Sequence, residues 1–228
     1  MRRILITGTS RGIGLELARQ YAARDERVFA TYRTPSAALK ALESVRVTLI
    51  PLDVADPASI EAAYHAVNAQ TDSLDVLINN AAISNEGDER LGTFEQASML
   101  SLFQTNTIAP VLIMQRFLEL LKRGATGKIV NLVSELASLE LRDASYAATY
   151  CATKAALNMY TRSLAHDLKP LGLTAFTIDP GWVQTDMGGR HAPLTPEQSV
   201  SGILRVIDQA NRDANGRFFR HDGAEMPW

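Results

Sequence analysis

The sequence of 228 residues predicts a doubly wound α/β fold, in which helices cover both faces of one parallel β-sheet of about seven strands. Three observations support this prediction. Short β-rich apolar runs alternate with helical patterns along the chain, a glycine-rich turn separates the first run from the first helix, and polar residues follow most of the runs. Without a linker, repeat or low-complexity segment, residues 1–228 are expected to form a single domain.

The first unit has a β-α-β pattern. The apolar run 3–7 suits a buried parallel strand, and it leads into a turn with glycines at Gly8, Gly12 and Gly14. A helical pattern and a second strand at 28–32 follow. Glycines let the backbone turn sharply and approach a ligand, and a helix N-terminus attracts a pyrophosphate. The unit therefore resembles a Rossmann dinucleotide-binding turn, although its G-x-x-x-G-x-G spacing differs from G-x-G-x-x-G.

The alternation continues to the end of the chain. Asp56 is expected to cap the helix that Pro57 opens. The remaining expected elements are a helix at 37–43, a strand at 45–52, a helix at 57–69, a strand at 74–78, one or two helices over 94–122, a strand at 128–133, a helix at 144–166, a strand at 174–178, a helix at 196–209 and a strand at 216–219. In such sheets, ligands bind beyond the carboxyl ends of the strands.

Composition excludes several function classes. Apolar residues make up 46% of the chain and charged residues 21%, and the net charge of -2 gives no electrostatic reason to bind nucleic acid or an anionic membrane. The single cysteine, Cys151, forms no internal disulfide, and the scattered histidines predict no metal site. No apolar run reaches about 18 residues, and no signal-peptide pattern precedes the first strand, so a cytoplasmic protein is expected.

Tyr150 and Lys154 carry the clearest chemical signal. Their spacing of four places them on one face of a helix, about one turn apart. A nearby ammonium lowers the pKa of a phenol, which can then exchange a proton with a substrate oxygen. A surface lysine beside a half-buried aromatic ring would show the same spacing. The polar motifs at the predicted strand ends favour the chemical interpretation.

Four motifs resemble those of the short-chain dehydrogenase/reductase family over essentially the whole chain. They are Thr7-Gly8-x-x-x-Gly12-x-Gly14, Asn79-Asn80-Ala81, Tyr150-x-x-x-Lys154 and Pro180-Gly181. Segments 180–187 and 216–228 are most similar to the branch of carbonyl reductases typified by the C-factor and sniffer proteins.

This resemblance implies a role for each motif. Tyr150 would be the general acid/base, Lys154 would lower its pKa and bind the nicotinamide ribose, Ser134 would polarise the carbonyl, and Asn106 would support a water near Lys154. The implied cofactor-binding residues are Gly8, Ser10, Arg11, Gly12, Ile13, Gly14, Arg33, Asp53, Val54, Asn80, Ala81, Ala82, Tyr150, Lys154, Pro180, Gly181, Val183 and Thr185.

Three of these assignments have alternatives. Ser134 lies 16 residues before Tyr150 and Ser138 lies 12 before it, whereas the family gap is near thirteen. Ser134 is preferred because it directly follows a predicted strand. Asn106 could instead be an ordinary helix-kink or capping residue. Tyr146 is a rival tyrosine, but no lysine stands four residues after it.

The end of the second strand predicts NADP(H) over NAD(H). NAD-specific sites usually place an acidic side chain there, whereas this chain has Arg33 and no acidic residue. Arg33 can offer a planar fork to a 2′-phosphate, and Arg11 could approach the same group.

The predicted function is NADPH-dependent hydride transfer between nicotinamide and a carbonyl or alcohol substrate. The alternative is a cofactor-sensing or C-factor-like signalling protein on the same fold. Trp182 and Met187, in the loop before residue 196, suggest a partly apolar substrate pocket. A homodimer through the helices at 94–122 and 144–169 is expected over a monomer.

Overall fold

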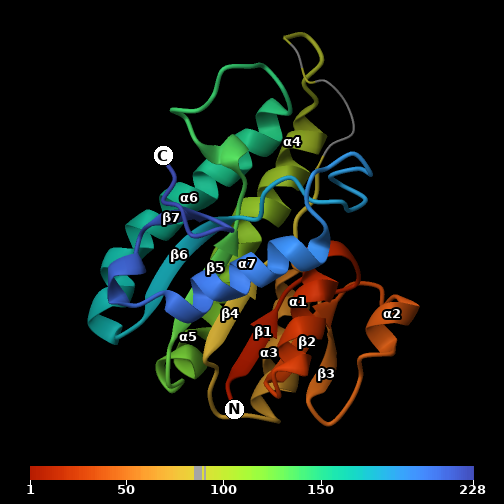
Figure 1. Ribbon diagram of the computed structural model, residues 1–228, viewed down its shortest axis with the longest axis vertical. Coiled ribbons are helices and arrows are strands. Elements are labelled where there is room, and N and C mark those ends of the chain that lie inside the picture. The colour runs from red at the N-terminus through yellow and green to blue at the C-terminus, as the bar shows by residue number, and fades with distance from the viewer. Residues whose placement is uncertain (85–88, 90) are drawn as a thin grey trace.

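In the computed structural model, which describes residues 1–84, 89 and 91–228, seven parallel strands form one sheet in the order β3-β2-β1-β4-β5-β6-β7 (Figure 1). The strands are β1 (Arg3–Ile6), β2 (Arg27–Tyr32), β3 (Val47–Pro51), β4 (Val76–Asn79), β5 (Lys128–Leu132), β6 (Thr174–Asp179) and β7 (Phe218–Arg220). The predicted doubly wound Rossmann fold is therefore confirmed.

Helices cover both faces of this sheet. They are α1 (Gly12–Ala23), α2 (Ala37–Lys40), α3 (Pro57–Asn68), α4 (Gln96–Phe103), α5 (Ala109–Lys122), α6 (Ala148–Leu168) and α7 (Pro196–Gln209), with short turns η1 (Gln104–Ile108), η2 (Glu135–Ala137), η3 (Lys169–Leu171) and η4 (Arg212–Ala214). Side chains of α1, α2 and α7 form one buried cluster with the sheet, and side chains of α3, α5 and α6 form another. In Figure 1, α1 and α7 lie on the near face of the sheet.

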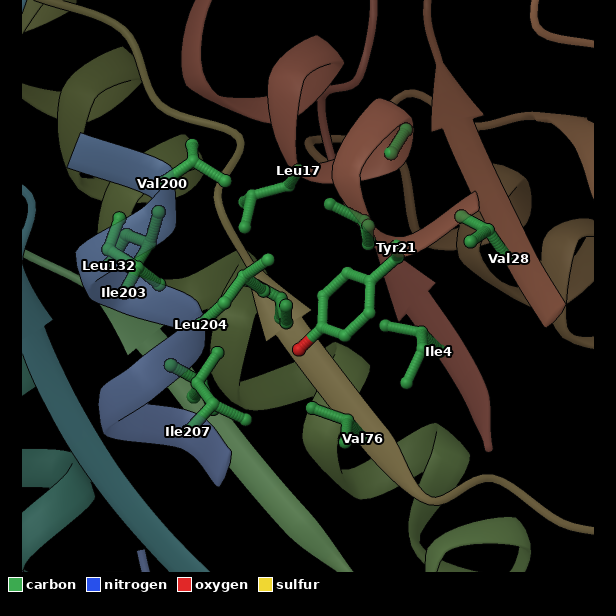
Figure 2. Close-up of a cluster of buried hydrophobic side chains, with 14 of the residues drawn as sticks. Ile4, Leu17, Tyr21, Val28, Val76, Leu132, Val200, Ile203, Leu204 and Ile207 are labelled. Atoms are coloured by element: carbon green, nitrogen blue, oxygen red, sulfur yellow. The ribbon is translucent and has the colours of Figure 1, made fainter. Parts of the chain in front are cut away.

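The contact between α1 and α7 holds the helix into which the glycine-rich turn leads. Tyr21 of α1 is fully buried, and its ring points toward Leu204 and Ile207 of α7 (Figure 2). Burying a large apolar side chain contributes about 1.5–3 kcal/mol. This packing anchors α1, whose N-terminus begins at the turn that follows β1.

Strand order also defines where a ligand can bind. The chain moves outward from β1 to β2 and β3, and then returns to place β4 on the other side of β1. The carboxyl ends of β1 and β4 therefore flank the point at which the order reverses. Open α/β sheets bind their ligands in the crevice at this point.

The segment Gln96–Lys122 is a continuous helix of 27 residues, and an 18-residue window within it has a mean hydropathy of 1.3. By length and composition it could cross a membrane, which the sequence analysis did not anticipate. Its α5 part buries Ile113, Phe117 and Leu120 against the sheet, as a core helix does. The π-helical turn η1 interrupts the regular helix within the predicted region.

The predicted start of α6 at residue 144 is wrong, because the helix begins at Ala148. Ala147 has a left-handed backbone with φ 46° and ψ 47°, and its side chain supplies no cap. The Glu89 carboxylate instead accepts a hydrogen bond from the Thr149 backbone N–H at 2.7 Å. An acidic residue distant in sequence therefore caps the helix that carries Tyr150.

Candidate active site

A cleft of about 410 Å³ opens at the carboxyl ends of β1 and β4. It is lined by Gly8, Ser10, Arg11, Gly12, Ile13, Gly14, Arg33, Leu52, Asp53, Val54, Ala55, Asn80, Ala81, Ala82, Ile83, Ser101, Thr105, Leu132, Val133, Tyr150, Lys154, Pro180, Thr185, Asp186 and Met187. The lining thus unites the segments that follow β1, β2, β3, β4, β5 and β6.

Close backbone packing explains the glycines in the first turn. Gly8 has φ 73°, and a Cβ there would lie 2.8 Å from the Ala81 Cα. A Cβ on Gly14 would lie 2.5 Å from the Asn80 Nδ2. That amide nitrogen donates to the Thr7 and Gly8 carbonyls at 2.8 and 2.9 Å. Asn80 therefore holds the glycine-rich turn against the segment after β4.

Two arginines stand at the β2 side of the cleft. Arg33 is exposed and lines the cleft just beyond β2. Arg11 forms an ion pair with Asp186 at 2.6 Å, and both side chains are more than two-thirds exposed. Exposed pairs contribute at most about 1 kcal/mol, so a stronger anion could displace Asp186. The predicted contact of Arg11 with a 2′-phosphate requires this exchange and stays a prediction.

Tyr150 and Lys154 meet inside the cleft. Lys154 is buried, its Nζ donates to the Leu132 carbonyl at 2.9 Å, and that nitrogen lies 5.8 Å from the centre of the Tyr150 ring. Burial lowers the pKa of Lys154 to about 8. Burial also raises the pKa of Tyr150, and nearby Asp179 and Cys151 raise it further. The lowered tyrosine pKa expected from the sequence is thus opposed by these surroundings.

The two candidate serines differ in how their hydroxyls are used. Ser134 is half-buried at the end of β5, and its oxygen accepts a hydrogen bond from the Leu136 N–H at 3.2 Å. Ser138 is 1% exposed, donates to the Trp228 carbonyl and accepts from the Leu141 N–H. The Ser138 hydroxyl is therefore occupied on both its donor and acceptor sides.

Asn106 lies in the π-helical turn and is fully buried. Its Oδ1 accepts from the Ile83 N–H at 2.9 Å, while its Nδ2 donates to the Ile83 carbonyl and to the Thr153 hydroxyl. The side chain therefore joins η1 to the segment after β4 and to α6. A role of Asn106 near Lys154 stays a prediction.

A comparison with models of protein families shows which family the chain belongs to. The model for the short chain dehydrogenases matches residues 2–193. The chain belongs to this family. The C-signal protein of Myxococcus xanthus is 42% identical over 163 residues, which cover 72% of this chain and 98% of that protein.

Solved structures of similar proteins give the same result. The NADPH-bound carbonyl reductase from chicken fatty liver has a TM-score of 0.92 and 34% identity, with 100% of this chain and 99% of that chain covered. The carbonyl reductase Sniffer of D. melanogaster has a TM-score of 0.93 and 29% identity, with both chains covered completely. This short-chain dehydrogenase is an NAD(P)-dependent oxidoreductase, and its resemblance to the C-factor and sniffer branch is confirmed.

Most of the predicted site residues of this short-chain dehydrogenase line the cleft. Among the described residues, four predicted ones do not: Asn106, Ser134, Gly181 and Val183. Val183 is buried and pairs with Leu194, while the Gly181 backbone packs against Leu194 and His221.

Several lining residues were not predicted. They include Ile83, Ser101 and Thr105. Ser101 lies in α4, outside every recognised motif, whereas Thr105 of η1 directly precedes the predicted site residue Asn106, so the sequence offered a signal for Thr105 alone.

Proposed function

We propose that this protein is an NADPH-dependent carbonyl reductase in which Tyr150 donates the proton. The observation that carries the proposal is the fixed pair in the cleft: the Nζ of Lys154 is held on the Leu132 carbonyl beside the Tyr150 ring. When bound, the nicotinamide supplies the hydride, and the protein supplies orientation and a proton.

The raised pKa of Tyr150 supports the direction of reduction. A phenol that stays protonated at neutral pH is available as a general acid for a developing alkoxide. The Lys154 pKa of about 8 leaves its ammonium mostly charged at pH 7, and that nitrogen lies 5.8 Å from the centre of the Tyr150 ring. Oxidation of an alcohol requires the Tyr150 phenolate, which burial disfavours.

Ser134 is the proposed second donor to the carbonyl oxygen. The Ser134 oxygen already accepts a hydrogen bond from the Leu136 backbone N–H. The hydroxyl proton is therefore free to point toward a substrate. A donor aimed at developing negative charge stabilises the transition state more than the ground state. The occupied hydroxyl of Ser138 favours Ser134 for this role.

NADPH is the proposed preferred cofactor because Arg33 lines the cleft beyond β2. Its guanidinium is exposed, and the segment Thr31–Thr34 contains no carboxylate that would repel a 2′-phosphate. The similar carbonyl reductase from chicken fatty liver has bound NADPH, which supports the proposal.

The direct test is oxidation of NADPH measured with a panel of aliphatic and aromatic aldehydes and ketones. The proposal expects turnover of at least one compound, with NADPH used more efficiently than NADH. Binding of NADPH without turnover of any compound would favour the second candidate function.

That second candidate is signalling or cofactor sensing. The similarity to the C-signal protein, at 42% identity, is the observation that favours it. The Tyr150 and Lys154 pair in the cleft favours the enzyme instead, since a sensor has no need of a proton donor.

A homodimer is the proposed assembly. Leu100 and Ile108, on the α4 side, and Met159 and Tyr160, on α6, are apolar side chains that are at least 42% exposed. These elements belong to the two helical regions from which the sequence predicts the interface.

A further inference from the structure

A second cavity, of about 560 Å³, lies away from the cleft that contains Tyr150 and Lys154. Its lining comes from the C-terminal half of α6, from η3 and η4, and from the segment 215–228. Among the described residues, none lines both cavities. Arg162 follows Tyr150 by 12 residues on α6, which corresponds to about 18 Å along the helix axis. A small ligand of this second cavity would therefore not contact the proposed catalytic pair.

Hydrogen bonds fix the wall of the cavity that Ala165, Asn215 and Gly216 form. The Asn215 side chain donates to the Ala165 carbonyl at 2.8 Å and accepts from the Ala175 N–H at 2.9 Å. The Gly216 N–H donates to the Ala175 carbonyl at 2.7 Å, and a Cβ on Gly216 would lie 3.2 Å from the Ala165 Cβ. The turn before β7 is thus tied to both α6 and β6. The cavity is therefore preformed, as small-molecule sites usually are.

Positive charge gathers in this cavity, although the chain as a whole has a net charge of -2. The basic lining residues, apart from His166, are Arg162, Lys169, Arg212 and Arg217, and the acidic ones are Asp213 and Glu225. Four cations against two carboxylates leave an excess of two positive charges. The C-terminal end of the α6 dipole carries about -0.5 charge, so it offsets only part of this excess.

Three of the four cations are available to a ligand. Arg217 is bound to the Glu225 carboxylate at 2.8 Å. In the part of the chain that the structure describes, Arg162, Lys169 and Arg212 form no ion pair, and all three are exposed. An anion can therefore bind them without displacing a carboxylate.

Trp228 gives the cavity an apolar side. Its half-buried ring lies 5.8 Å from the centre of the Phe218 ring, and the guanidinium carbon of Arg162 lies 5.0 Å from the centre of the Trp228 ring. These contacts hold the ring and place one of the three cations beside it. The cavity thus offers an apolar surface next to a binding place for an anion.

We propose that this cavity binds a small organic phosphate monoester, with the phosphate among Arg162, Lys169 and Arg212 and the organic group beside Trp228. A phosphate monoester carries about -1.5 to -2 charge near pH 7, which matches the excess of two positive charges better than a single carboxylate does. Guanidinium groups bind phosphate through paired hydrogen bonds. The site goes beyond the proposed oxidoreductase function and does not depend on it.

Calorimetric titration with phenyl phosphate tests the location of the site. Arg212→Gln and Lys169→Gln each remove one exposed cation and should leave the fold intact. Each should weaken binding of phenyl phosphate at least about tenfold, as expected for loss of a charge-assisted contact. Arg205→Gln, at an exposed position of α7 outside both cavities, is the matched control and should bind as wild type does. Arg33→Gln removes a cation of the other cleft and should also leave the affinity unchanged.

Two further probes test the class of ligand. Inorganic phosphate lacks the organic group, and benzoate replaces the phosphate by a carboxylate. Both should bind wild type at least about fivefold more weakly than phenyl phosphate does.

Absence of phenyl phosphate binding at millimolar concentration would overturn the inference. Equal losses in Arg33→Gln and Arg212→Gln would also overturn it, because the ligand would then lie in the cleft. Inorganic phosphate or benzoate binding as tightly as phenyl phosphate would contradict the class of ligand. None of these results bears on carbonyl reduction, so the proposed function is tested separately.

Discussion

At the scale of single residues, the two candidate serines differ in how their hydroxyls are bonded. The family gap lies closer to Ser138, which is 12 residues before Tyr150. In the structure, the Ser138 hydroxyl is fully used in binding Trp228 and Leu141, whereas the Ser134 hydroxyl keeps its proton available. The free hydroxyl proton directly after β5 supports the proposed role of Ser134.

Ser134→Ala should lower turnover about 10²-fold, as loss of a donor to a developing oxyanion does. Ser138→Ala is the matched control and should change turnover little. It should cost about 1 kcal/mol of stability, because the Trp228 carbonyl and the Leu141 N–H lose a partner. Steady-state kinetics and urea unfolding of both variants measure these effects. A reversed order of the two losses in turnover would assign the role to Ser138.

Arg33→Asp should weaken NADPH binding at least about tenfold and NADH binding little, because a charge-assisted contact with a phosphate contributes roughly 1.5–3 kcal/mol. Arg205→Asp, at an exposed position of α7 outside the cleft, controls for the change in net charge. Fluorescence titration with both cofactors measures the effect. Equal affinities of the wild-type protein for NADPH and NADH would contradict the assignment.

At the scale of elements, the sequence predicted the strands and the residues that follow them, but not how α6 starts. Strand periodicity and glycine spacing are local properties, and they led to Gly8, Gly14 and Asn80. The start of α6 depends on a carboxylate at position 89, and no local pattern links that position to Thr149.

Glu89→Gln should lower the free energy of unfolding by about 1 kcal/mol, because the α6 N-terminus loses a charged cap. Glu95→Gln is the matched control, since Glu95 precedes α4 without a side-chain capping bond. Urea unfolding of the two variants distinguishes them. An equal loss in both would mean that the Glu89 contact contributes nothing specific.

At the scale of the whole molecule, the exposed apolar side chains of α4, η1 and α6 predict a dimer. Sedimentation at micromolar concentration should show a species of twice 24.9 kDa. Met159→Glu should shift it toward the monomer, because a charge would be buried at the proposed interface. A wild-type species of 24.9 kDa alone would rule out this assembly.

The two buried clusters and the strand order bring segments from across the chain to one cleft, and Tyr150 is central to what that cleft is proposed to do. The most direct measurement therefore determines two quantities for Tyr150→Phe: its turnover and its affinity for NADPH. Tyr146→Phe is the control, because Tyr146 is exposed. We expect Tyr150→Phe to lose turnover by about 10²–10⁴-fold while its NADPH affinity stays close to wild type, because only the proton donor is removed. Tyr146→Phe should keep wild-type turnover. Wild-type turnover in Tyr150→Phe would contradict the proposed mechanism.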